Sequence, residues 1–256
     1  MIEDFIKTEV NYIKLFSEIY EDDNIIRFWD SNIKDMYTHN FTLIKNDLGS
    51  EYVREIILSE LKLRKDSEND FLRIEFNFNL EANILDELPI KPDVTKYDFM
   101  YIKSNDNYEL NGNKEAVIKK AVSEQIFNDG IHIDILSNET NMGREFATRR
   151  IHRKAEIYKK DNKLDFYVCY YNDAPIGSCE LMLNHKIAKL EDFDIYEKYQ
   201  RMGFGTSVIE YLLNEAKQNN SEIMYLITDS DDTAKDMYTK CGFKKAGQKT
   251  ELFFNL

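Results

Sequence analysis

The chain has 256 residues, with 34 basic and 47 acidic side chains and a formal net charge of −13 at pH 7. That length suffices for one large domain or two small ones, each with its own core. The acidic balance argues against general nucleic-acid binding and against an anionic membrane surface, because negative charge repels phosphate groups. Residues 1–4 lack the basic and apolar run of a signal peptide, and no stretch of about 18 apolar residues follows. We therefore expect a cytoplasmic protein.

Charge and glycine are unevenly distributed. Residues 1–112 carry 24 acidic and 13 basic side chains, whereas residues 113–256 carry 23 and 21. Only Gly49 precedes Gly112, and seven glycines follow Gly112. The polar stretch 104–113 is rich in turn-forming residues. We therefore predict two domains, residues 1–112 and residues 113–256.

The cysteines indicate no special chemistry. Cys169, Cys179 and Cys241 are odd in number and form no close pair. Their spacing predicts neither a disulfide framework nor a zinc site, and we expect no bound metal.

Alternating hydrophobic patterns predict the elements in chain order. In the first half they predict a helix over 50–65, a strand over 71–78, a helix over 80–88 and a strand over 97–103. A helix over 143–160 follows, with Phe146, Ile151, Ala155 and Tyr158 on one side. Strands over 164–171, 176–183 and 187–195 form an antiparallel meander. After the loop 200–205 come a helix from Thr206, a strand over 223–228, a helix over 232–240 and a strand over 250–254.

The order strand, loop, helix, strand is typical of a parallel crossover unit. We therefore predict an α/β (α+β) fold with a mixed sheet that combines the meander with this crossover. The crossover places the loop 200–205 at the carboxyl end of a strand, where α/β sheets bind ligands.

The loop has the sequence Gln200-Arg201-Met202-Gly203-Phe204-Gly205. The N-terminus of a helix carries unpaired N–H groups and a partial positive charge, so it can hold phosphate oxygens. Gly203 and Gly205 would let the backbone approach such an anion, because neither carries a Cβ. The hexapeptide by itself is equally consistent with an ordinary strand-to-helix turn.

A second motif lies about thirty residues further on, at Asp231, Ala234, Tyr238, Gly242 and Phe243. Together with the loop and the preceding meander, it makes residues 130–256 resemble the acyl-coenzyme A binding core of the GNAT superfamily of N-acetyltransferases. Two positions depart from the family pattern. Asp231 replaces an Asn that contacts coenzyme A in relatives, and Glu197 replaces a common Pro.

The resemblance implies acetyl-CoA as cosubstrate. Backbone amides from Arg201 to Thr206 would receive the pyrophosphate, with the Thr206 hydroxyl as a further donor, and the pantetheine arm would pair with the backbone of Phe193 and Ile195. The cofactor-binding residues implied in this way are Phe193, Ile195, Gln200, Arg201, Met202, Gly203, Phe204, Gly205, Thr206, Asp231 and Ala234. Nearby lysines are candidates for the 3′-phosphate, although each is equally typical of a solvated surface.

The resemblance also implies catalytic roles. Tyr238 matches the family position whose phenol protonates the leaving sulfur, with a packed aromatic as the alternative. A backbone N–H near Ile195 would stabilise the oxyanion. Strand alternation predicts that Glu191 faces with Phe193 and Ile195, and we take Glu191 as the candidate base. The alternative is an exposed strand carboxylate.

Residues 50–103 repeat the element order of residues 205–256 at an offset of 153 residues. This suggests a degenerate second copy of the same fold, in which Asp47 and Glu51 occupy the region where phosphate would bind and Leu85 replaces the tyrosine. An unrelated α+β accessory domain is the alternative.

The leading hypothesis is an acetyl-CoA-dependent N-acyltransferase that transfers an acetyl group to a primary amine of a small molecule or peptide, directly within a ternary complex. The acidic first half could attract a cationic amine, or serve solubility only. The alternatives are a non-catalytic acyl-CoA-binding sensor or interaction module and, less favoured, a scaffold that binds no ligand. We expect an amine substrate, neither nucleic acid nor membrane as partner, and a homodimer as the candidate assembly.

Overall fold

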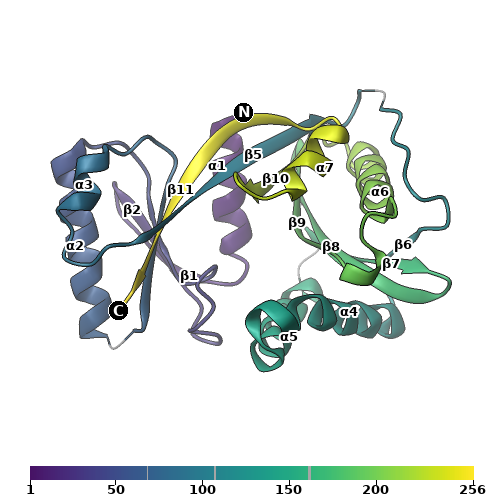
Figure 1. The fold of residues 1–256 in the computed structure, drawn as a ribbon, viewed down its shortest axis with the longest axis horizontal. Coiled ribbons are helices and arrows are strands. Elements are labelled where there is room, and N and C mark those ends of the chain that lie inside the picture. The colour runs from purple at the N-terminus through teal and green to yellow at the C-terminus, as the bar shows by residue number, and fades with distance from the viewer. Residues whose placement is uncertain (68, 107, 161–162) are drawn as a thin grey trace. The chain divides into compact units, whose positions relative to one another are not determined.

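The computed structural model describes residues 1–67, 69–106, 108–160 and 163–256. Asn107, in the predicted linker, lies outside these residues. The elements, shown in Figure 1, are α1 (Ile2–Ile13), β1 (Glu18–Glu21), β2 (Ile25–Trp29), β3 (Thr42–Ile44), α2 (Ser50–Asp66), β4 (Phe71–Phe76), α3 (Ala82–Asp86), β5 (Asp93–Lys103), β6 (Val117–Lys120), α4 (Glu124–Met142), α5 (Arg144–Tyr158), β7 (Leu164–Tyr171), β8 (Ala174–Asn184), β9 (Ile187–Ile195), the 3-10 turn η1 (Glu197–Tyr199), α6 (Phe204–Gln218), β10 (Ile223–Asp229), α7 (Ala234–Lys240) and β11 (Lys244–Asn255).

The described residues form two compact units that are interleaved along the chain. Unit 1 comprises residues 1–15, 100–227 and 233–246, and unit 2 comprises residues 16–99, 228–232 and 247–256. These units differ from the predicted division at residue 112. The N-terminal helix α1 belongs to unit 1 with the second half of the chain, while the end of β11 belongs to unit 2, where it pairs antiparallel with β4.

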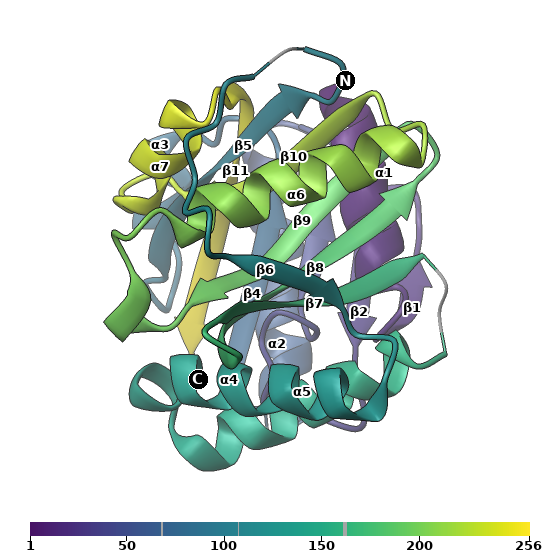
Figure 2. The ribbon, with the colours of Figure 1, turned by 90° about the vertical axis from the view of Figure 1, so that its right-hand side faces the viewer.

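Unit 1 contains a mixed sheet in the order β5-β10-β9-β8-β7-β6. Strands β6 to β9 pair antiparallel in sequence, and β9 pairs parallel with β10, with α6 as the crossover between them. Helices α4 and α5 lie on one face of this sheet and α6 lies on the other (Figure 2). The predicted combination of a meander with a parallel crossover is confirmed.

The apolar core of unit 1 lies between α6 and the sheet. Its fully buried members include Leu181 on β8, Ala188 on β9, Met224 on β10, and Val208 and Leu212 on α6. The helical spacing of the α6 residues puts them on one face, so the core forms as the crossover closes. This core fixes the start of α6 against the end of β9.

Several predicted bounds agree with the structure, but β11 is longer than the predicted strand over 250–254, and six elements were not predicted: α1, β1, β2, β3, β6 and α4. Strands β7 and β9 begin and end as predicted, and α6 begins two residues earlier, at Phe204. The assignment of Phe146 to the buried side of α5 is wrong: Phe146 is half-buried and contacts Arg149, while that side contains Ala147, Ile151 and Ala155. At 100° per residue, Phe146 points away from Ile151.

Unit 2 contains strands in the order β1-β2-β3-β4-β11. Strand β3 pairs parallel with β4 across the crossover helix α2. The core includes Val53, Ile57 and Leu61 of α2 and Ile74 and Phe76 of β4. The predicted helix over 50–65 is thus present and covers the sheet of unit 2.

Hydropathy places no helix of the described residues across a bilayer, since none combines the required length with sufficient apolar character.

Candidate functional site

The start of α6 has the geometry of an anion site. The N-cap is Gly203, with φ of 85°, and no side chain forms a capping hydrogen bond with it. The three residues that follow open the helix, so their N–H groups have no acceptor one turn earlier. Arg201 and Met202, just before the cap, are exposed. The first turn of α6 therefore offers backbone donors and the positive end of a helix dipole.

The two loop glycines lie close to other atoms of the protein. A Cβ on Gly205 would lie 2.9 Å from the Met237 sulfur on α7, and a Cβ on Gly203 would lie 3.1 Å from the backbone nitrogen of Asn113. The φ of Gly203 is also unfavourable for other residues. The sequence argument that a Cβ would obstruct a bound anion is therefore incomplete, because the crowding partners are protein atoms.

Asn113 fastens a preceding segment onto the loop. Its backbone N–H donates to the Gly203 carbonyl at 3.2 Å, and its side-chain amide donates to the Met202 carbonyl at 3.0 Å. The Ser207 hydroxyl in turn donates to the Asn113 carbonyl at 2.9 Å. The bonds from Asn113 use the carbonyl groups of Met202 and Gly203. Because the C=O and N–H of a peptide unit point in opposite directions, the N–H groups of these peptide units point away from Asn113.

Strand β9 extends beyond its pairing with β10. The parallel pairing joins residues 187–189 to residues 223–225, and β9 then continues to Ile195. In the part of the chain that the structure describes, β10 thus provides no register partner for the second half of β9. Gln200 closes the loop onto this half, since its side-chain amide donates to the Ile195 carbonyl at 2.8 Å. Phe193 and Ile195 lie where an extended ligand could pair.

A β-bulge interrupts β9 at Asp192. Asp192 has a φ of 44°, and the register against β8 shifts so that Ser178 opposes Asp194 while Glu180 opposes Glu191. One extra residue in β9 restarts the side-chain alternation. The side chains of β9 therefore cannot be assigned to faces by counting from one end.

The prediction that Glu191 faces with Phe193 and Ile195 is wrong for this reason. Glu191 lies on the face of the sheet that α4, α5 and α1 cover, opposite Glu180 of β8. The Lys189 ammonium contacts the Glu191 carboxylate and lies 2.7 Å from the carboxylate of Glu9 on α1. Phe193 and Ile195 pack on the other side, against the core of α6. Glu191 is thus held in an ion pair, and its role as a base stays a prediction.

A cluster of buried ions covers the bulge on the α4–α5 face. It consists of Asp134, Arg150, Lys154, Glu180 and Asp192, which we call the buried ion cluster. Arg150 lies 2.7 Å from Asp134 and 2.6 Å from Asp192, and Lys154 contacts Asp192 and lies 2.5 Å from Glu180. These contacts fix the left-handed residue of the bulge from two consecutive turns of α5.

The cluster shifts the pKa values of its carboxyl groups in opposite directions. Burial raises the pKa of Asp134 to about 6 and that of Glu180 to about 7, in spite of the neighbouring cations. Burial also disfavours ionisation of Asp192, but the guanidinium of Arg150 and the ammonium of Lys154 outweigh it and hold its pKa below the usual value. Asp192 is therefore the carboxyl group of the cluster whose ionised form is most strongly favoured.

The structure places Tyr238 on α7, where its side chain is buried in the core of unit 1 and packs against Phe243. The neighbouring Cys241 thiol donates to the Thr206 hydroxyl at 4.0 Å, so this hydroxyl faces α7. Burial raises the pKa of Cys241, which fits a packing role. The structure thus brings α7 onto the first turn of α6, and the proton-donor role of Tyr238 stays a prediction.

Two further cofactor candidates lie in the segment before α7 and at its start. Ala234 begins α7 in unit 1, and Asp231 is an exposed residue of unit 2 whose amide donates to the Asp229 carboxylate at 2.9 Å. The contact of Asp231 with coenzyme A stays a prediction.

Sequence reasoning missed Asn113 and the buried ion cluster. Arg150 and Lys154 occur four residues apart within the buried face of a predicted helix, which is a detectable signal, because buried cations need partners. Their partners could not be found from the sequence, since α4, the bulge in β9 and the approach of β8 are features of the tertiary fold.

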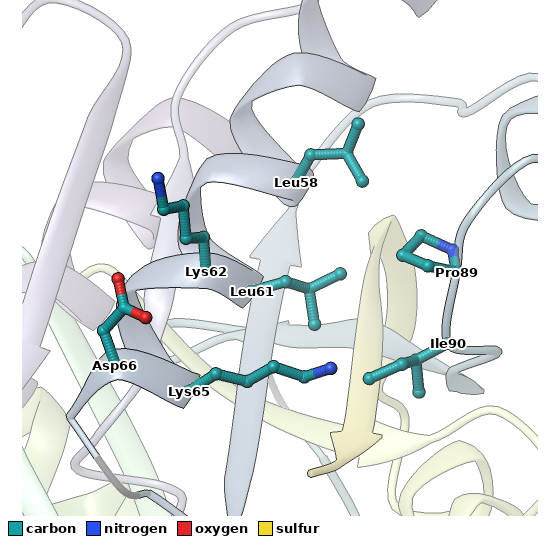
Figure 3. A pocket seen from close by; sticks show the side chains of 7 residues that line it. All are labelled: Leu58, Leu61, Lys62, Lys65, Asp66, Pro89 and Ile90. Atoms are coloured by element: carbon teal, nitrogen blue, oxygen red, sulfur yellow. The ribbon is translucent and has the colours of Figure 1, made fainter.

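Unit 2 contains a pocket of about 260 Å³ that lies apart from the loop at the start of α6. Leu58 and Leu61 of α2 face Pro89 and Ile90 across it, and the Lys65 side chain extends toward Ile90 (Figure 3). Lys62 and Asp66 complete the lining. No residue of the loop or of the buried ion cluster lies here.

The comparisons with known proteins agree with this geometry. Residues 133–243 match the Acetyltransferase (GNAT) family. The chain is 28% identical over 250 residues to the "Uncharacterized N-acetyltransferase CgeE" of Bacillus subtilis (strain 168), covering 93% of both proteins.

Two solved structures share the fold over nearly the whole chain. A functionally unknown conserved protein from Staphylococcus epidermidis has a TM-score of 0.76 and 20% identity, covering 94% of this chain and 95% of that one. A GCN5-related N-acetyltransferase from Kribbella flavida has a TM-score of 0.73 and 10% identity, covering 98% and 94%.

The mixed sheet, the uncapped start of α6 at Gly203 and these matches together identify an acyltransferase-type fold. Residues 133–243 form a domain of the GNAT superfamily of acetyltransferases, which supports acyl transfer in general. The similarity to both structures also extends over unit 2.

Proposed function

We propose that the protein is an acetyl-CoA-dependent N-acyltransferase that acetylates a primary amine of a small molecule or peptide within a ternary complex. The first turn of α6, uncapped at Gly203 beside the half of β9 that has no register partner on β10 among the described residues, is the observation that carries this proposal. Donors at a helix N-terminus suit a pyrophosphate, and the second half of β9 suits an extended pantetheine arm.

The residues present fit such a cosubstrate. Amides of Phe204, Gly205 and Thr206 would hold the pyrophosphate, and the backbone of Phe193 and Ile195 would pair with the arm. Bound acetyl-CoA would supply the activated thioester. The amine nitrogen would attack the thioester carbonyl carbon and lose a proton to a base, for which Glu191 is the candidate. The C–S bond would break, the leaving sulfur would take a proton from the Tyr238 phenol, and the phenolate would regain its proton from solvent.

The experiment combines calorimetry with turnover. Acetyl-CoA should bind the wild-type chain, and a panel of amines should release free thiol from it. Tyr238→Phe should retain binding and lose turnover by about 10²–10⁴-fold, the range of general acid catalysis. Binding without turnover on any amine would favour an acyl-CoA-binding module, and absence of binding would refute the proposal.

We also propose that unit 2 is a degenerate copy of the same fold. Its order β3, α2, β4, α3, β5 repeats the order β9, α6, β10, α7, β11, and its crossover helix α2 has a glycine N-cap, Gly49, with φ of 84°. Asp47 accepts from the Gly49 amide at 3.1 Å, and Glu51 lies in the first turn of α2. Carboxylates here would repel phosphate, so calorimetry should find one acetyl-CoA per chain. Two sites would contradict the loss of binding.

A further inference from the structure

Asp194 differs from the other acidic residues around the bulge. The carboxylates of Glu191 and Asp192 pair with cations, whereas Asp194 forms no ion pair among the described residues. Its side chain accepts one hydrogen bond at 3.1 Å, from the amide of Asn138 on α4. Burial and the neighbouring Asp192 carboxylate raise the pKa of Asp194, although Asn138, Arg150 and Lys154 act in the opposite direction.

Ser178 provides a second, independent observation. Ser178 is the register partner of Asp194 on the neighbouring strand β8, so the two side chains share a face of the sheet. Ser178 is only 3% exposed, and its hydroxyl has no hydrogen-bond partner within the described ranges. A buried hydroxyl without a partner costs free energy, and a ligand group could remove that cost.

The charge around this pair favours a cation. Six carboxyl groups lie on or against this face of the sheet, those of Glu9, Asp134, Glu180, Glu191, Asp192 and Asp194, and three cations oppose them, those of Arg150, Lys154 and Lys189. Asp194 is partly exposed, so a ligand can reach it. An ammonium group would supply both the missing positive charge and a donor for the Ser178 oxygen.

The bulge relates this position to the proposed reaction. Phe193 and Ile195, which would pair with pantetheine, point to the α6 face, and Asp194 between them points to the α4–α5 face. An acceptor bound at Asp194 would thus lie on the opposite side of β9 from the core of α6.

We propose that Asp194 and Ser178 form a subsite for an ammonium group of the acceptor. The nitrogen that is acylated must be unprotonated, so the ammonium bound here is a second, non-reacting amino group. The acceptor class is therefore an amine that carries a further positive charge, such as a diamine or polyamine. The inference rests on the proposed N-acyltransferase function.

The test uses 1,4-diaminobutane as the probe and 1,4-butanediol, of similar length and without charge, as its neutral control. Calorimetry on the full chain should detect binding of the diamine and none of the diol. Asp194→Asn should weaken diamine binding at least tenfold. Ser178→Ala should weaken it at least threefold without lowering the melting temperature, because it removes an unsatisfied hydroxyl.

Glu145→Gln is the matched charge control. It removes one carboxylate from α5 at a side chain that is 93% exposed and should leave diamine binding unchanged. Equal diamine binding by wild type and Asp194→Asn, or no diamine binding by wild type, would overturn the subsite. Acetyl-CoA binding, measured on the same variants, tests the proposed function separately and should be unchanged in all of them.

Discussion

The Tyr12 hydroxyl donates a hydrogen bond of 2.7 Å to the Glu180 carboxylate. Tyr12 lies on the N-terminal helix α1 and Glu180 on β8, so 168 residues separate the partners. Tyr158 of α5 and Lys154 also contact this carboxylate. Helix α1 thus completes the environment of a buried carboxyl group in unit 1, although it precedes the GNAT family match by more than a hundred residues.

Removing the Tyr12 hydroxyl should destabilise the protein. In Tyr12→Phe the buried Glu180 carboxyl loses a donor that water cannot replace, and we expect a loss of about 1–3 kcal/mol in the free energy of unfolding. Urea denaturation followed by circular dichroism measures it. Tyr52→Phe, at a surface position, is the control and should change stability by less than about 0.5 kcal/mol. Equal losses in both variants would contradict the role of the Tyr12–Glu180 bond.

The pKa of Glu180 predicts how stability depends on pH. Burial raises this pKa from 4.5 to about 7, so the folded state binds the proton more tightly than the unfolded state. The contribution of Glu180 to the free energy of unfolding is therefore fully present below pH 4.5. It is lost as the pH rises toward 7, by about 1.4 kcal/mol for each pH unit between the two pKa values. Glu180→Gln does not titrate and should lack this decline.

The measurement is the free energy of unfolding of wild type minus that of Glu180→Gln between pH 4 and pH 8. We expect this difference to fall as the pH rises from 4.5 to 7 and to be constant above and below. A difference that rises with pH would show that Lys154 dominates and that the carboxyl group is ionised throughout.

The loop and the meander could be predicted from the sequence because their signals are local. Gly203 and Gly205 appear in the order that a strand-to-helix turn requires, and the alternation within residues 164–195 marks three strands. The structure has β7 and β9 at the predicted bounds for that reason.

The faces of β9 could not be predicted, because a bulge is a property of the register with β8. One left-handed residue, Asp192, moved Glu191 to the face opposite to the one that alternation predicts. The interleaved units escaped prediction for a similar reason. The pairing of β11 with β4 and the packing of α1 join segments that are distant in sequence, and no local pattern records them.

The Gly205 contact predicts a specific rescue. A Cβ at this position would lie 2.9 Å from the Met237 sulfur, which belongs to a flexible side chain. We expect Gly205→Ala to lower the free energy of unfolding by no more than about 1 kcal/mol, because the Met237 side chain can move aside and alanine favours the helix, and to weaken acetyl-CoA binding by displacing the first turn of α6. Met237→Ala should restore stability in the double variant. Thermal denaturation and calorimetry on the two single variants and the double variant measure the coupling, and additive losses would contradict the contact.

A substitution of Gly112 should not be rescued by shortening a neighbouring side chain, because the atoms that crowd Gly112 belong partly to the backbone. A Cβ on Gly112 would lie 2.2 Å from the Ser207 hydroxyl oxygen, 2.7 Å from the Ser207 nitrogen and 2.9 Å from its Cα. Gly112→Ala must therefore push the Asn113 segment off the start of α6. We expect weaker acetyl-CoA binding and a lower melting temperature, and Ser207→Ala should not restore either, because the backbone contacts remain. Full rescue by Ser207→Ala would show that only the hydroxyl obstructs the Cβ and that the Asn113 segment does not support the loop.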